Sequence, residues 1–271
     1  MKSFAHRVAV VTGAGSGIGR ATSELLAQRG CHVALVDING DGLVETSRRV
    51  QSLGRTASTH CADVADADQM AALPEQVLAI HGGCHILVNN AGVTSAGAFA
   101  EESLDDLRWI VGVNVWGVVH GCRAFLPVLR QAEEAHVVNM SSMVGLLGLP
   151  YNAPYSLTKG AVRSFTEALR AELITTAIGV TAVFPGAIRT NITNAARGSE
   201  SERLARMGQS RFAPLVMRPP RAVSRRIVSA IEHDRARVVV GPDARVVDLV
   251  TRLVPGRSGL VGRLTSRLAT S

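Results

Sequence analysis

The sequence predicts an α/β fold with a doubly wound, mostly parallel seven-stranded sheet and helices on both faces. Three observations support this prediction. Short β-branched runs alternate with helix-length amphipathic stretches almost throughout the 271 residues. The runs are continuously apolar, as expected for strands that are covered on both faces. The length suits one large domain, and no repeat or low-complexity stretch interrupts the order.

Each element is predicted from its own pattern. The short β-branched runs predict strands at 7–12, 32–37, 56–61, 85–90, 136–141, 179–184 and 237–241. The amphipathic stretches predict helices near 17–29, 40–53, 66–80, 103–131, 154–177 and 221–233.

Two segments fall outside the alternation and set the expected domain organisation. Residues 190–220 are rich in glycine, proline and mixed polar residues, which predicts a long, partly helical lid over a substrate site. Residues 243–271 form a basic tail that begins as a short amphipathic helix. We therefore expect a main domain at 1–242, with the lid inside it, followed by this tail.

The net charge of +7 is concentrated at the C-terminal end. Residues 1–200 hold 15 basic and 17 acidic side chains, whereas residues 201–271 hold 14 arginines and five acids. An arginine-rich amphipathic tail can contact an anionic membrane surface, and packing at a subunit interface is the rival hypothesis. Nucleic-acid binding has no support beyond charge, because no matching motif or aromatic cluster accompanies it.

The cysteines favour a reducing cytoplasm and no metal site. Cys31, Cys61, Cys84 and Cys122 lie far apart, without a CxxC pair or a histidine at metal-ligand spacing. The N-terminal apolar run is too short for the core of a signal peptide, and no 18-residue apolar span is expected anywhere. The sequence shows no targeting segment.

A glycine-rich turn follows the first predicted strand and opens the first helix. In "TGAGSGIGR", residues 12–20, Gly13, Gly17 and Gly19 permit a tight turn, close approach of the backbone to phosphate and close helix packing. The helix N-terminus attracts a pyrophosphate. The spacing is GxxxGxG rather than GxGxxG. This arrangement predicts a Rossmann-like dinucleotide site.

Asp37 ends the second predicted strand, 18 residues after Gly19. A carboxylate there can accept hydrogen bonds from both ribose hydroxyls of an adenosine, and it repels a 2′-phosphate. This favours NAD over NADP, although Arg20 could compensate for the charge. A strand-end cap is the alternative role for Asp37.

Tyr155 and Lys159 form a YxxxK pair in a chain whose only other lysine is Lys2. Residues at i and i+4 share one helix face, and Pro154 suits a first helical turn. An ammonium about 5 Å from the phenol would contribute roughly 3 kcal/mol and lower the phenol pKa by about two units. Tyr155 would then be a useful acid–base catalyst.

Five motifs in order closely resemble the classical short-chain dehydrogenase/reductase family. They are TGxxxGxG at the first turn, "NNAG" at 89–92, "NMSS" at 139–142, YxxxK at 155–159 and "PGAIRT" at 185–190. The resemblance spans residues 7–241. One departure is Leu157, where the family commonly has a small residue, and this affects packing rather than chemistry.

The resemblance implies a catalytic tetrad of Asn114, Ser142, Tyr155 and Lys159. Ser142 would hydrogen-bond the substrate oxygen, Tyr155 would exchange the proton, and Asn114 would hold a water that links Lys159 to solvent. Ser141 is expected to be structural. The cofactor residues expected from the motifs and the resemblance together are Gly13, Ser16, Gly17, Ile18, Gly19, Asp37, Asp63, Val64, Asn90, Ala91, Gly92, Tyr155, Lys159, Pro185, Gly186, Ile188 and Thr190.

These features predict an NAD-dependent oxidoreductase that moves a hydride between the nicotinamide and a secondary alcohol or its ketone. The expected pocket after Ser142 is mostly apolar, which favours a lipid-like or steroid-like substrate. Two alternatives stay open: an NADP-dependent ketoreductase of acyl thioesters, and a cofactor-binding sensor without turnover. The resemblance also implies a homodimer or homotetramer.

Overall fold

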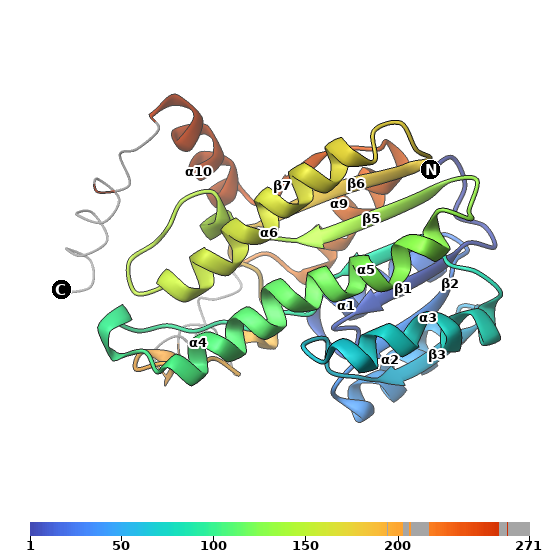
Figure 1. Ribbon diagram of the computed structural model, residues 1–271, viewed down its shortest axis with the longest axis horizontal. Helices are drawn as coiled ribbons and strands as arrows, with labels where there is room; N and C mark the ends of the chain where they lie inside the picture. The colour runs from blue at the N-terminus through green and yellow to red at the C-terminus, as the bar shows by residue number, and fades with distance from the viewer. Residues whose placement is uncertain (194, 203–205, 207–216, 255–258, 260–271) are drawn as a thin grey trace.

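The computed structural model describes residues 1–193, 195–202, 206, 217–254 and 259 (Figure 1). One sheet of seven strands organises this part of the chain, in the order β3-β2-β1-β4-β5-β6-β7. The strands are β1 (Val8–Thr12), β2 (His32–Asp37), β3 (Ala57–Cys61), β4 (Ile86–Asn89), β5 (Ala135–Met140), β6 (Ile178–Pro185) and β7 (Arg237–Val240). All six neighbouring pairs are parallel. The predicted doubly wound parallel sheet is confirmed.

Helices cover both faces of the sheet, because alternate residues of each strand point to opposite sides. Ala9 and Val11 of β1 pack with α1 (Gly17–Gln28), α2 (Gly40–Gln51) and α9 (Pro220–Glu232). Val8 and Val10 pack on the other side with α3 (Ala67–His81), α5 (Gly117–Leu129) and α6 (Ala153–Glu172). Figure 1 shows α5 and α6 in front of the sheet and α9 behind it.

The long helix predicted at 103–131 is interrupted in the structure. It consists of α4 (Leu104–Val111), a π-helical turn η2 (Gly112–Trp116) and α5. The Asn114 side chain accounts for the local distortion, since it turns inward and hydrogen-bonds both the N–H and the C=O of Val93. A π-turn inside an α-helix often marks a functional site.

Within the described residues, the run Leu104–Leu129 is long and apolar enough to cross a membrane by length and composition alone. Its most apolar 18-residue window has a mean hydropathy of 1.2. The expectation that no such span occurs is therefore wrong. Ile110, Phe125 and Leu129 of this run are fully buried in the folded protein, so the run also serves as a core helix.

The predicted lid and tail are described only in part. Residues 195–202 follow a short helical turn, η4 (Asn191–Thr193), whereas 203–205 and 207–216 lie outside the described residues. The tail begins as the expected helix, α10 (Pro242–Leu253). Its Asp243 accepts a hydrogen bond from the Ala187 N–H at 2.7 Å. The division of the chain at 242 stays a prediction.

Candidate active site

The glycine turn between β1 and α1 forms a cradle that larger residues would fill. Gly13 and Gly17 have φ of +65° and +53°, which side chains rarely adopt. A Cβ on Gly19 would lie 2.0 Å from the Gly13 carbonyl oxygen. The close packing of this helix against the turn therefore requires glycine at position 19.

Thr12 and Asn90 join this turn to the end of β4. The Thr12 hydroxyl accepts hydrogen bonds from the N–H groups of Asn90 and Ala91, each at 3.0 Å. The Asn90 side-chain amide donates a hydrogen bond to the Thr12 carbonyl at 2.9 Å. Sequence reasoning gave Thr12 no role, although it is the first residue of the glycine motif.

A cavity of about 450 Å³ opens beside the turn. This volume lies in the range of small-molecule and cofactor sites. Eleven of the expected cofactor residues line it: Gly13, Ser16, Gly17, Ile18, Asp37, Asp63, Val64, Asn90, Ala91, Gly92 and Thr190. The start of α1 borders the cavity through Ser16, so the helix N-terminus can attract an anion there. The site therefore fits a dinucleotide.

Asp37 lines this cavity, and both of its carboxylate oxygens accept hydrogen bonds. Oδ2 accepts a hydrogen bond from the Gly15 N–H at 2.8 Å, and Oδ1 accepts one from the Asn39 N–H at 2.9 Å. Each oxygen keeps capacity for a further bond. The turn thus holds the carboxylate in the cavity wall, where a ribose hydroxyl could reach it.

Several expected cofactor residues lie outside the cavity lining. Gly19 packs against the Gly13 carbonyl of the turn. Pro185 ends β6, and the N–H of Gly186 after it donates a hydrogen bond to the Val240 carbonyl. Ile188 packs against the core. Other residues line the cavity without having been predicted: Ile38, Asn39, Ala62, Val93, Trp109, Val113, Ile192 and Ala195. Their apolar or neutral side chains gave no chemical signal in the sequence.

Ser142, Tyr155 and Lys159 come together between β5 and α6. Ser142 precedes the short turn η3 (Met143–Gly145), where its hydroxyl accepts a hydrogen bond from the Val144 N–H at 3.4 Å and lies near enough to the Tyr155 phenol to act on its pKa. The Lys159 ammonium lies 5.7 Å from the centre of the Tyr155 ring. It also donates a hydrogen bond to the Met140 carbonyl at 3.0 Å. The helical i, i+4 spacing thus places the two side chains of the YxxxK pair side by side.

Burial controls the pKa values of this pair. It raises the pKa of Tyr155 to about 12, against which the Ser142 hydrogen bond acts in the lowering direction. It lowers the pKa of Lys159 to about 8, because a charged ammonium is poorly solvated there. The expected lowering of the phenol pKa by Lys159 is therefore not what the structure gives. Desolvation outweighs the Ser142 hydrogen bond.

Asn114 and Lys159 both lie against Gly92, which lines the cavity. A Cβ on Gly92 would lie 3.2 Å from Asn114 Oδ1 and 3.3 Å from Lys159 Nζ. The Asn114 amide donates its two hydrogen bonds to the Val93 carbonyl and the Thr158 hydroxyl. The water link from Asn114 stays a prediction, and in this structure its side chain fixes the loop after β4.

Ser141 has the structural role expected of it. Its hydroxyl donates a hydrogen bond to the Lys159 carbonyl at 2.7 Å. This bond ties the end of β5 to α6, one residue away from Ser142. Among the described residues, no cluster of three or more histidine, cysteine or acidic side chains could hold a metal ion.

Comparison with known proteins identifies the family. A family model described as short chain dehydrogenase matches residues 7–201. SadH of Mycobacterium tuberculosis, described as an oxidoreductase, is 38% identical over 256 residues, which cover 94% of this chain and 93% of SadH.

Solved structures agree with this result. A short-chain dehydrogenase/reductase from Burkholderia phymatum, in complex with NAD, has a TM-score of 0.86 and 32% identity over 93% of this chain and 95% of its own. A metagenomic short-chain oxidoreductase in complex with NADP has a TM-score of 0.72 and 27% identity, over 87% and 97% of the two chains. The chain belongs to the short-chain dehydrogenase family and is an NAD(P)-dependent oxidoreductase.

Proposed function

We propose that this enzyme oxidises a secondary alcohol, or reduces the corresponding ketone, with NAD as its cofactor and Tyr155 as the acid–base residue. One observation carries the proposal. Gly92 lines the dinucleotide cavity and also lies against Lys159, the partner of Tyr155. The catalytic side chains are thus next to the place where a nicotinamide would have to lie.

Asp37 supports NAD over NADP. A 2′-phosphate at the adenosine ribose would meet a carboxylate that the turn holds in place. The Arg20 guanidinium donates hydrogen bonds to the Thr46 hydroxyl at 3.0 Å and to the Gly15 carbonyl, so it would have to leave these partners to pair with a 2′-phosphate. One of the two solved relatives is in complex with NAD and the other with NADP. The proposed preference of this chain for NAD therefore depends on Asp37. When bound, NAD supplies the hydride acceptor, and NADH the donor.

The remaining chemistry falls to three side chains. Ser142 would donate a hydrogen bond to the substrate oxygen and hold it beside the phenol. Tyr155 holds its proton at neutral pH and would give it to a ketone oxygen during reduction, which leaves a phenolate. In the oxidation direction, that phenolate would take the proton of the alcohol. The Lys159 ammonium would stabilise the phenolate that forms when the proton leaves.

An apolar, lipid-like or steroid-like substrate suits the residues that follow Ser142. Four apolar side chains that follow the catalytic serine are partly buried and partly exposed: Met143, Leu146, Leu147 and Leu149. An acyl thioester with NADP is the second substrate class to test, because the lid segment carries several arginines. A cofactor-binding sensor without turnover would not need the four side chains of the catalytic tetrad.

The test is absorbance at 340 nm with NAD or NADP and secondary alcohols of three kinds: steroids, hydroxyacyl thioesters and small diols. We expect turnover with NAD and an apolar alcohol. Tyr155→Phe should lower kcat at least about a hundredfold, because the acid–base group is lost, while NADH still binds. Near-normal turnover by this variant would overturn the proposed mechanism. NADH binding without turnover of any alcohol would favour the sensor.

We further propose a cytoplasmic homodimer or homotetramer. Trp116 of η2 is 53% exposed and Leu157 of α6 is 57% exposed. η2 packs against α6, so both apolar side chains belong to neighbouring elements on one face of the sheet. Large exposed apolar side chains grouped in this way are typical of a subunit interface.

A further inference from the structure

Helix α10 presents an apolar face that the described fold does not cover. Four of its side chains and that of the residue after it have exposed fractions from 38% to 71%. These are Val246, Leu249, Val250, Leu253 and Val254. The first four have the spacing i, i+3, i+4 and i+7, which places them along one side of the helix. Figure 1 shows α10 at the edge of the molecule.

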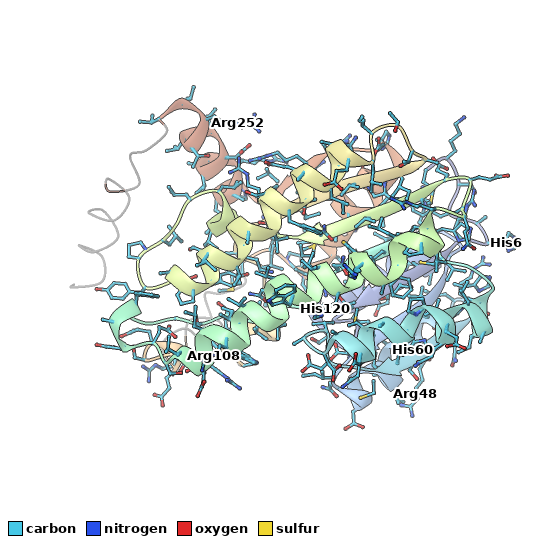
Figure 2. All side chains as sticks on the ribbon, in the orientation of Figure 1. His6, Arg48, His60, Arg108, His120 and Arg252 are labelled. Atoms are coloured by element: carbon cyan, nitrogen blue, oxygen red, sulfur yellow. The ribbon has the colours of Figure 1, made fainter. Side chains whose placement is uncertain are left out.

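The charges around this face are positive. Arg245 is exposed, and Arg252 is 61% exposed at the outer end of the helix, where Figure 2 labels it. The two acids of α10 are directed to the protein. Asp243 accepts from the Ala187 N–H, and Asp248 pairs with Arg237 as well as with Arg252.

The sequence beyond the helix extends this positive charge. Residues 254–271 contain three arginines and no acidic residue, interleaved with leucine and valine. We infer that α10 docks on an anionic lipid surface. The apolar face would enter the headgroup region, and the arginines would pair with lipid phosphates. A second copy fits less well, because pairing two such faces would bring like charges together.

The position of α10 relates the proposed lipid docking to the active site. The helix packs against η3, the turn directly after Ser142. The docking surface therefore lies beside the catalytic end of the sheet, where an apolar substrate could arrive from a bilayer. This link to the substrate rests on the proposed function, whereas lipid binding itself does not depend on it.

Sedimentation of the full-length protein with vesicles tests the inference. We expect binding to vesicles of phosphatidylcholine with phosphatidylglycerol, little binding to phosphatidylcholine alone, and release at high salt. Leu249→Asp with Leu253→Asp should weaken binding at least tenfold, and Arg245→Gln about fivefold. Ile80→Asp, at a side chain 55% exposed on α3, is the matched control and should bind as wild type.

Point variants are preferable to truncation. Removing the chain from Asp243 onward would also remove the bonds of Asp243 to Ala187 and of Asp248 to Arg237. Unchanged thermal unfolding and NADH binding would show that the Leu249/Leu253 variant is folded. The inference is overturned if this variant binds vesicles as wild type does, or if wild type ignores anionic lipid. It is also overturned if the variant changes only the oligomeric state, which would make the face a subunit contact. None of these results depends on finding the substrate.

Discussion

At the scale of single residues, Lys159 shows how burial prepares a side chain for chemistry. It is 2% exposed and has a carbonyl and an aromatic ring as neighbours instead of a carboxylate. Its pKa of about 8 lies close to neutral pH. The ammonium is therefore charged at pH 7 but close to losing its proton, whereas the neighbouring phenol holds its proton firmly.

This position of the Lys159 pKa predicts an alkaline limb in ketone reduction. As the pH rises through about 8, the ammonium loses the charge that stabilises the phenolate, and kcat/KM should fall by about tenfold per unit. Lys159→Arg keeps a charge over this range. Whatever its residual activity, this variant should lack the limb near pH 8. A limb that persists unchanged in the pH profile of Lys159→Arg would assign it to another group.

At the scale of elements, the β1–α1 junction depends on the missing side chain of Gly19. A Cβ there would meet the Gly13 carbonyl, so Gly19→Ala must move α1 away from the turn. We expect this variant to lose about 1–3 kcal/mol of unfolding free energy and to bind NADH at least about tenfold more weakly. Denaturant unfolding and a fluorescence titration with NADH would measure both effects.

Gly40→Ala is the control for this substitution. Gly40 lies in the first turn of α2, and a Cβ there would have no atom within 4 Å. We expect its unfolding free energy to stay within about 0.5 kcal/mol of wild type. If Gly19→Ala bound NADH as tightly as Gly40→Ala, the tight packing at the turn would not be needed for the site.

The same elements show what the sequence could and could not predict. Continuous apolar strands were sufficient for the sheet and its direction, because that pattern reflects burial directly. The cavity residues followed from the glycine spacing together with the family resemblance, which supplied Asp63, Gly92 and Thr190. The π-turn at Asn114 was missed, since it depends on a contact with Val93, which lies 21 residues away in the chain. Trp109 and Val113 were missed in the cavity because apolar side chains there look like ordinary core.

The phenol pKa was predicted in the wrong direction for a related reason. The sequence places Lys159 beside Tyr155, but it does not show how deeply the pair is buried. A charge estimate made without desolvation gives a lower phenol pKa, whereas burial raises it. Pair geometry follows from helical spacing, but the dielectric environment depends on the whole fold.

At the scale of the whole molecule, His136 links stability to pH. It lies in β5 with 2% exposure, and its Nε2 bonds the Thr181 hydroxyl at 2.7 Å. Because that hydroxyl donates to the Arg235 carbonyl, it accepts from Nε2–H and leaves Nδ1 unprotonated. Burial lowers the His136 pKa to about 4, and the nearby Asp234 only partly opposes this. The folded protein thus keeps the imidazole neutral.

The unfolded chain binds a proton at His136 below its ordinary pKa of about 6.5, whereas the folded chain does so only below about 4. The unfolding free energy should therefore fall as the pH drops from about 6.5 to about 4, by at most about 3 kcal/mol from this residue. His136→Gln should flatten that part of the slope. The pKa values of His81 and His85 are also lowered, so protonation of these two residues would still decrease the unfolding free energy of the variant on acidification.

Denaturant unfolding at pH 7, 6 and 5 would measure the slope, with His233→Gln as the control at an exposed histidine. We expect the control to follow wild type and His136→Gln to lose less stability on acidification than either. Equal slopes in all three proteins would show that His136 takes up its proton at the same pH in the folded and unfolded chains. In that case the buried contact with Thr181 would not hold the imidazole neutral, and acid destabilisation would have to come from other groups.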